Sequence, residues 1–312
     1  MRYLLGRLIH SLLLVLGVTL VSFFLMVYFG PDQTYSLLGK NASAEQIAEL
    51  RAELGYDQGF LNRYVDYVSE LFTLRLGASN SSGAPVRDIL AKSLPVTLAL
   101  VLPGFILGNV LGMALGMLAA EYRNRWPDRL ISTVSVAGMS VSFLIVIIVL
   151  QVVMCTPYGL NLFPARGWQV NGLASYIDFV TVPTICLVVI TLGYNTRFFR
   201  AVFIEENGRE HIRVARAFGA SPAEIMVKHV LKNSLPPVLT RIMFSVPLII
   251  VSGSLLLESY FGIPGIGKVT FDAITNGNQP VLKAVVGLTA VMFIAAQLLT
   301  DLVNRIVDPR VS

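Results

Sequence analysis

Residues 94–120 read LPVTLALVLPGFILGNVLGMALGMLAA, and this stretch decides the class of fold. It contains no charged side chain, and a membrane helix needs about 20 apolar residues to cross a hydrocarbon core of about 30 Å. The whole chain agrees with this reading, with 54% hydrophobic residues, 14% charged residues and a mean hydropathy of +0.69. A chain of 312 residues with this balance is too apolar for a soluble domain and is predicted to be a helical membrane protein.

Five further apolar segments predict an all-α, polytopic protein with six transmembrane helices. The first segment follows Arg2 and Arg7, as in a signal peptide, but no small-residue cleavage site comes after it. We therefore expect it to remain as a membrane anchor. The six predicted spans are residues 12–29, 94–120, 130–154, 179–196, 236–260 and 284–303.

Lysine and arginine are distributed unevenly over the predicted loops. With a cytoplasmic N-terminus, segments 1–11, 121–129, 197–241 and 301–312 face the cytoplasm and hold 15 basic residues. The two short loops on the other side hold Arg166, Lys268 and Lys283. Because basic residues in short loops favour the cytoplasm, both termini are predicted to be cytoplasmic. The net charge of +5 is then explained by the flanks of the spans, and nucleic-acid binding is not predicted.

The segment after the first span is long enough to fold by itself. Ser43 and Gln46 form a capping-box pattern, and an apolar stripe follows at Phe60, Tyr64, Val68 and Leu71. We predict three parts: residues 1–29 with the first span, a small external helical subdomain at 30–93, and a five-span core at 94–312. The subdomain is expected either to cap the spans or to dock an external partner.

The sequence GIPGIGKVT at 262–270 approaches a phosphate-binding loop without completing it. Val269 stands where that loop needs a serine or threonine hydroxyl, and an apolar run precedes Gly262 in place of a bounded strand. Cys155 and Cys186 form no metal-binding pattern, and no nucleophile–histidine–acid arrangement is present. The chain is therefore predicted to have no nucleotide site, no metal, no cofactor and no enzymatic activity of its own.

The loop at 204–235 has the most informative pattern in the chain. Residues 210–218 predict a short helix with Ile212, Ala215 and Phe218 on an apolar side and Arg209, Arg213 and Arg216 on a wet side. Gly219 suits a positive φ at the end of that helix, and Ser221, Pro222 and Glu224 predict the capped start of a second one. The chain is expected to restart as the fifth span near Ser234. A basic linker on anionic lipid would explain the arginines but not the paired caps, so a docking element is favoured.

These residues resemble a known family. EHIRVARAFGAS (210–221) and KHVLKNSLPPV (228–238) are similar to the EAA loop of inner-membrane permease subunits of bacterial ABC importers, in the dipeptide/oligopeptide/nickel branch, B-type subunit. ESYFGIPGIGK (258–268) and LTDLVNRIVDPR (299–310) also resemble that family, and the likeness covers essentially the whole chain. The wider family has a glutamate where this chain has Arg213, and its peptide branch often has a basic residue at Phe218.

The resemblance implies a type I importer in the bacterial inner membrane. Its other parts would be a second homologous permease subunit, two cytoplasmic ATPase subunits that bind ATP and Mg²⁺, and an external substrate-binding protein. The residues expected to couple this chain to an ATPase groove are Glu210, Ile212, Arg213, Ala215, Arg216, Ala217, Phe218 and Gly219, with Ser221, Pro222 and Glu224 as cap and hinge. The solute would be a short peptide, or a nickel chelate, glutathione or another small solute.

Polar residues inside the spans are few and uncharged. Asn109, Gln151 and Gln297 are candidates for the translocation path, but each equally suits an interhelical hydrogen bond. Glu258 and Asp301 fall near span ends, where pairing with arginine or contact with water is expected. A proton-coupled carrier acting alone would need ionisable groups in mid-span, and a membrane assembly factor would need no path. The carrier and the assembly factor both remain as alternative functions from other classes of protein.

The predicted topology can be tested by labelling single cysteines in intact cells. Cysteines at Ala78 and Gly172 are expected to react with an impermeant thiol reagent added outside, because both lie in predicted external segments. A cysteine at Gly208 is expected to stay unlabelled until the membrane is opened. External labelling at Gly208 would overturn the orientation.

Overall fold

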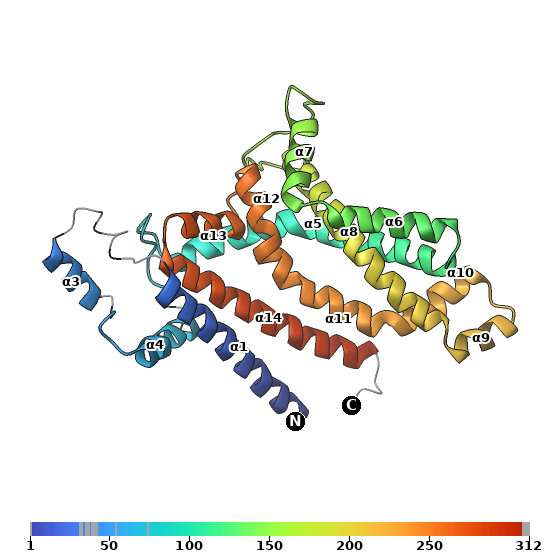
Figure 1. Ribbon diagram of the computed structural model, residues 1–312, viewed down its shortest axis with the longest axis horizontal. Coiled ribbons are helices and arrows are strands. Elements are labelled where there is room, and N and C mark those ends of the chain that lie inside the picture. Colours follow the sequence, from blue (N-terminus) through green and yellow to red (C-terminus); the bar gives the residue numbers. More distant parts are fainter. Residues whose placement is uncertain are drawn as a thin grey trace.

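The computed structural model describes residues 2–30, 34, 38, 43–53, 55–73 and 75–307, and these residues fold almost entirely as helices (Figure 1). The only β pairing in this part of the chain is an isolated bridge between Ala78 and Pro85. The helices are α1 (Arg2–Phe29), α3 (Ala44–Glu53), α4 (Phe60–Phe72), α5 (Val86–Glu121), α6 (Trp126–Ser140), α7 (Phe143–Cys155), α8 (Leu173–Asn207), α9 (Glu210–Ala217), α10 (Pro222–Glu224), the π-helix η1 (Ile225–Leu231), α11 (Lys232–Leu248), the π-helix η2 (Ile249–Gly253), α12 (Ser254–Phe261), α13 (Ile266–Thr275) and α14 (Gln279–Val307).

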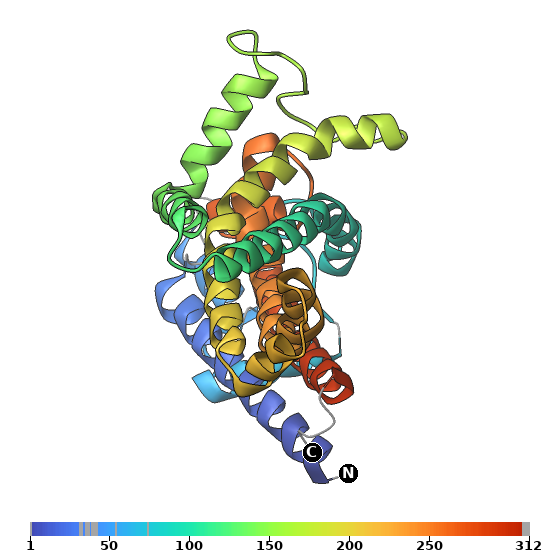
Figure 2. The same cartoon turned by 90° about the vertical axis from the view of Figure 1, so that its right-hand side faces the viewer.

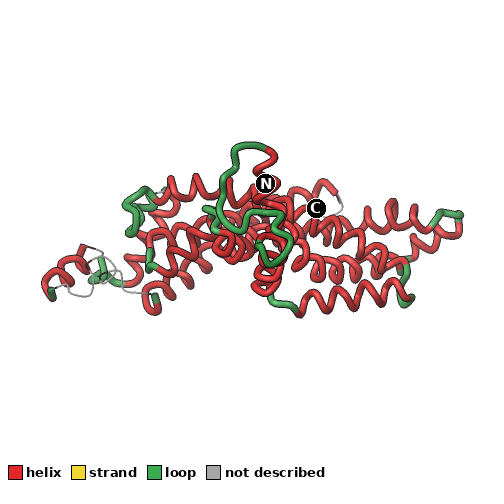
Figure 3. Tube along the Cα trace, turned by 90° about the horizontal axis from the view of Figure 1, so that it is seen from above, coloured by secondary structure: helices red, strands yellow, loops and turns green. Residues whose placement is uncertain are grey.

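The molecule is elongated, and its two ends carry different elements. Figure 1 shows α3 and α4 at one end and α9 and α10 at the other, with the long helices between them. The start of α1 and the end of α14 lie near each other in Figures 1 and 2, while α7 projects from the side of the bundle. In Figure 3 helices run the whole length, and the loops gather at the ends and over the middle.

The most extensive helix contact joins α5 to α8. A Cβ added at Gly112 would lie 2.7 Å from Cβ of Asn195, and one added at Gly116 would lie 2.9 Å from Cβ of Phe199. The glycines therefore allow the two backbones to approach as small residues do in membrane helix pairs. This glycine seam comprises Gly104, Gly108, Gly112 and Gly116 against Leu187, Thr191, Asn195 and Phe199. Residue numbers increase in the same direction along both helices, so α5 and α8 run parallel, and the four glycines serve helix packing.

Among the residues that the structure describes, four helices are long and apolar enough to cross a membrane: Val86–Glu121, Leu173–Asn207, Pro222–Phe261 and Gln279–Val303. The pair Trp126–Ser140 and Phe143–Cys155 makes a fifth if its two helices count as one span. The stretch Val15–Phe29 of α1 is a shorter apolar helix. The structure thus gives an all-helical polytopic protein with four or five candidate spans.

The third predicted span, residues 130–154, is not one straight helix but the bent pair α6 and α7. The chain turns by 95° between α6 and α7, where Val141 and Ser142 adopt extended backbone angles. Two contacts hold α6 against α8. Asp128 bonds the guanidinium of Arg200 through both oxygens, at 2.5 and 2.7 Å, and a Cβ at Gly193 would lie 2.7 Å from the carbonyl oxygen of Ser135. Because a hydropathy pattern carries no information about contacts between distant residues, it could not predict this bend.

The fifth predicted span is longer than expected, and the predicted restart near Ser234 is wrong. Helix runs without interruption from Pro222 to Phe261, through Pro236 and Pro237. A proline normally disrupts a helix because it removes an N–H bond and crowds the preceding turn. Here the π-helical segment η1 directly precedes α11, and its wider turn absorbs the irregularity in place of a break.

The glycine seam predicts a position-specific cost for a single methyl group. Gly112→Ala is expected to lower the yield of folded protein in the membrane, since overpacking in a close contact costs about 1–3 kcal/mol. The matched control is Gly138→Ala in α6, where an added Cβ meets nothing within 4 Å. Membrane yield and thermal stability of the two variants provide the measurement. Equal losses in both variants would contradict the seam.

Candidate functional site

The segment from Arg209 to Glu224 folds as two helical turns around one glycine. Gly219 has φ +85°, in the left-handed region that glycine adopts without steric cost, and it follows α9 directly. Ser221 caps the next helix by accepting the backbone N–H of Glu224 at 3.3 Å, and Pro222 takes the first helical position. The side chain of Glu224 bonds Lys228 at 2.7 Å, so only the serine half of the predicted capping box forms.

One side of the α9 helix is packed against the protein and the other side is exposed. These two sides do not match the predicted apolar and polar sides. Ile212 is completely buried, Ala215 is half-buried and Phe218 is 88% exposed, so the predicted single apolar side is wrong. Phe218 lies outside the helix as its C-cap residue, which explains why it leaves the stripe. The exposed surface, here called the α9 outer face, consists of Glu210, Arg213, Val214, Ala217 and Phe218.

Ile212 attaches α9 to the long helices. It belongs to a buried cluster that joins α5, α8, η1 and α11, namely Ala120, Phe199, Phe203, Ile225, Met226, Val230 and Val238. Sequence analysis placed Ile212 on the docking side because periodicity cannot distinguish an apolar face turned inward from one turned outward. Val214 was missed for the same reason.

Polar contacts also fix the helix at its start. Arg209 Nε donates to the buried carboxylate of Glu206 at 2.9 Å, and His211 Nε2 lies 3.3 Å from the other oxygen of that carboxylate. Arg216 donates to the side-chain oxygen of Asn207 at 2.7 Å. Arg209 and Arg216 are therefore bonded to the end of α8 and are not the free wet surface that the sequence suggested.

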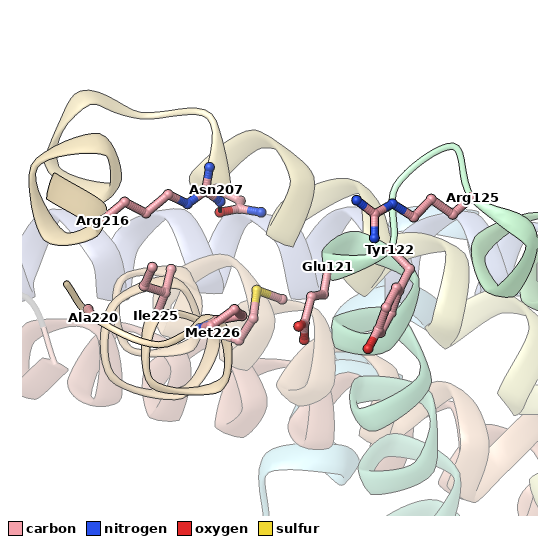
Figure 4. Close-up of a pocket in the computed structure, with 9 residues that line it drawn as sticks. Glu121, Tyr122, Arg125, Asn207, Arg216, Ala220, Ile225 and Met226 are labelled. Carbon is pink, nitrogen blue, oxygen red and sulfur yellow. Dashed lines mark hydrogen bonds between the residues drawn. The ribbon is translucent and has the colours of Figure 1, made fainter.

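A pocket of about 260 Å³ lies between the α9–α10 bend and the end of α5 (Figure 4). Figure 4 shows Arg216 approaching from α9, beside Asn207, and Arg125 on the far side, near Glu121 and Tyr122. The floor is apolar and includes Ile225 and Met226. The Ile212 cluster thus holds the bend against the long helices, and the pocket leaves open space between Arg216 and Arg125. Sequence analysis gave no signal for the residues from α5.

The segment at 262–270, which resembles a phosphate-binding loop, contains the N-terminus of helix α13. Its negative partner is internal: the backbone N–H of Lys268 donates to Glu258 Oε2 at 3.0 Å, and Thr97 Oγ1 donates to Oε1 at 2.6 Å. The Lys268 ammonium bonds Asp272 at 2.9 Å. Because a helix N-terminus attracts negative charge, the position that a phosphate would take is filled by Glu258. Glu258 is fully buried, so its predicted contact with arginine or water is wrong.

The three path candidates lie apart, and two of them make hydrogen bonds within the fold. Asn195 Nδ2 donates to Asn109 Oδ1 at 3.2 Å across the glycine seam. Gln151 Nε2 donates to the carbonyl oxygen of Ala165 at 2.7 Å and fastens the loop after α7. Gln297 is half-buried on α14. The structure therefore does not bring these residues together.

The amino-acid sequence is similar to those of known transport proteins. The family model described as "Binding-protein-dependent transport system inner membrane component" matches residues 112–312, and its N-terminal companion matches residues 1–101. A dipeptide transport system permease protein, DppB, of Lactococcus lactis subsp. cremoris is 35% identical over 312 residues, covering 99% of both chains. A glutathione transport system permease protein, GsiC, of Escherichia coli O6:H1 is 31% identical over 313 residues, covering 100% of this chain and 99% of that one.

A third relative is a probable peptide ABC transporter permease protein, y4tP, of Sinorhizobium fredii, 30% identical over 313 residues, with 99% of this chain and 98% of that one covered. The family description implies an external binding protein and ATPase subunits as partners. It also describes a transport component and not an enzyme. The chain belongs to the family of binding-protein-dependent transport system inner membrane components, as a multi-pass permease of the ABC transporter class.

Proposed function

We propose that this chain is the permease subunit of an importer for short peptides, driven by ATP hydrolysis in partner subunits. The observation that carries the proposal is the α9 outer face, a small and largely apolar surface on a helix fixed to the bundle by the buried side chain of Ile212. A transmission element needs both properties: a free surface for the ATPase and a stiff attachment to the spans. Solvation alone does not explain Phe218 at 88% exposure beside Val214 at 54%.

The route of the motion follows from the Ile212 cluster. A displacement of α9 presses on Phe199 and Phe203 of α8, and on Val230 and Val238 of the helix at 222–261. Both are candidate spans, so a movement of the ATPase would be passed to two membrane helices at once. Packed helices of this kind exchange between discrete arrangements, and this suits alternation between outward-open and inward-open states. A second homologous permease is proposed to complete the path.

Six spans with both termini in the cytoplasm remain our proposed topology. The parallel course of α5 and α8 supports it, because the chain must return across the membrane once between two parallel spans, and the bent pair α6–α7 supplies that return. Adding α1 gives six. The basic end of the molecule at α9 and α10 is then the cytoplasmic one.

The proposed solute is a short peptide, with glutathione or a nickel chelate as alternatives in the same family. Support comes from the full-length similarity to permeases named for dipeptide, peptide and glutathione. Asn109 and Gln151 are occupied by bonds within the fold, which suits a path that binds its solute weakly. Selectivity would then belong to the external binding protein. Uptake in proteoliposomes with purified binding proteins and competing solutes would identify the solute.

A proton-coupled carrier is the alternative from another class, and one experiment separates the two. Vesicles that contain this chain without its ATPase partners are expected to show no uptake under a proton gradient. The assembled complex is expected to transport when ATP is supplied on the ATPase side. Gradient-driven uptake by the chain alone would overturn the proposal.

Gly219 provides the sharpest test of coupling. Gly219→Val is expected to abolish uptake at near-normal membrane level, because a β-branched residue is strained at φ +85° and the α9 outer face would be displaced. An added Cβ meets nothing within 4 Å at this position, so the effect would come from the backbone angle and not from a clash. Uptake, ATPase activity and co-purification of the ATPase in the reconstituted complex are the measurements.

Two variants serve as controls. Gly219→Asn is expected to keep most of the uptake, since asparagine tolerates the left-handed region. Gly208→Ala is expected to be mild, because Gly208 has φ −82°. Arg209→Ala is unsuitable as a neutral control, given its bond to Glu206. Wild-type uptake by Gly219→Val at matched expression would refute the role of this bend.

A further inference from the structure

Helix α4 has three distinct sides, and the protein covers only one of them. Tyr67 and Leu71 are buried against α1 and α14, with Phe60, Tyr64 and Val68 partly buried beside them. The adjacent side carries an exposed apolar row of Leu61 (71% exposed), Val65 (62%) and Phe72 (59%), here called the α4 outer row. The third side is polar and includes Asn62, Asp66, Ser69 and Glu70. With 3.6 residues per turn, the apolar surface of α4 extends continuously past the part that the protein covers.

The contacts of α4 place it beside membrane helices and not beyond their ends. The hydroxyl of Tyr64 donates to the carbonyl oxygen of Leu16 at 2.8 Å and lies 3.0 Å from Thr19 Oγ1, both far inside the apolar part of α1. The Tyr67 hydroxyl donates to the carbonyl oxygen of Lys283 at 3.2 Å, and a Cβ on Gly287 would overlap the side chain of Leu71. Lys283 and Gly287 belong to the candidate span Gln279–Val303. α4 therefore lies alongside the apolar part of α1 and beside the first turns of α14.

The outer row continues an aromatic surface on α1. The Phe60 ring lies 6.1 Å from that of Phe24 and 6.0 Å from that of Tyr28, measured between ring centroids. Phe24, Tyr28 and Phe29 are themselves exposed, at the end of the uncharged apolar stretch 12–29 of α1. Aromatic residues gather at this position because their rings favour the boundary between acyl chains and headgroups.

The polar side of α4 lines a pocket that lies away from the α4 outer row. This pocket of about 200 Å³ has a lining that includes Arg63, Asp66, Glu70 and Lys283. The charged groups can therefore stay hydrated while the opposite side of the helix is apolar. This division between an apolar and a charged side is the signature of a helix that lies at a membrane boundary.

We propose that α4 is a membrane-boundary helix, and that the α4 outer row contacts the acyl chains of phospholipids at the α3–α4 end of the molecule. The occupant of the row is lipid because the row is contiguous with the exposed aromatic surface of α1, and because α4 contacts residues within two apolar helices. The proposal rests on the membrane setting of the family and is independent of the solute transported. It places residues 60–72 of the predicted external subdomain at the membrane boundary.

Spin labels on the assembled complex in phospholipid vesicles test the proposal. Single cysteines at Leu61, Val65 and Phe72 are compared with matched exposed positions on the polar side, Asn62, Asp66 and Ser69, in a background without Cys155 and Cys186 and with cysteine-free partner subunits. Collision rates are measured with oxygen, which concentrates in the bilayer, and with a neutral nickel chelate, which stays in water. The ratio of oxygen to nickel collisions is expected to be severalfold higher at the three row positions than at the three polar ones.

Two results would overturn the proposal. Equal access of the nickel chelate to all six positions would place α4 in water. Protection of the row from both reagents would mean that protein, such as the second permease or the external binding protein, covers it. A label-free pair gives an independent check: Leu61→Asp is expected to lower the amount of membrane-assembled complex, while Asn62→Asp is not. Equal assembly of the two variants would also count against lipid contact.

Discussion

The close parallel approach of α5 and α8 is the constraint on which the rest of the structure depends. Four glycines on α5 remove the side chains that would hold the helices apart, and the contact is strengthened by a hydrogen bond between Asn195 and Asn109. In a bilayer no hydrophobic force drives helices together, so close packing and polar contacts must supply the association. Once the pair is formed, α6 is tied to α8 through Asp128 and Arg200, and α7 is directed away from the bundle.

The same pair carries the connection to the α9 outer face. Phe199 contributes to the seam through its Cβ and to the Ile212 cluster through its ring, so α8 is shared between membrane packing and the loop. Glu206, buried at the end of α8, holds Arg209 and His211 at the start of α9. A loop attached in this way moves with its helix, which is the mechanical requirement for passing a partner's motion to the spans.

Glu258 joins separate helices near the start of α5, as Glu206 does at the end of α8. A buried carboxylate is costly unless hydrogen bonds satisfy it, and here the bonds come from Thr97 of α5 and from the first turn of α13. The Thr97 hydroxyl also accepts the backbone N–H of Ile266 at 2.7 Å, so three separate segments meet at one point. The glycines near Lys268 have separate structural reasons. A Cβ at Gly265 would overlap the Glu258 carboxylate, and one at Gly267 would lie 2.5 Å from the backbone nitrogen of Leu255. Gly262 follows α12 with φ +68°.

The sequence by itself determined the membrane class, the helical content, the bend at Gly219 with its serine cap, and the absence of a completed phosphate-binding loop. These features depend on local rules of length, hydropathy and backbone angle, which act within a few residues. The same rules could not decide which side of α9 turns inward, because Ile212 and Val214 are equally apolar and only the cluster around Phe203 distinguishes them. Nor could they locate the break between α6 and α7 or the burial of Glu258. Those features arise from contacts between residues far apart in the chain, such as Asp128 with Arg200 and Glu258 with Thr97, which form only when the helices pack.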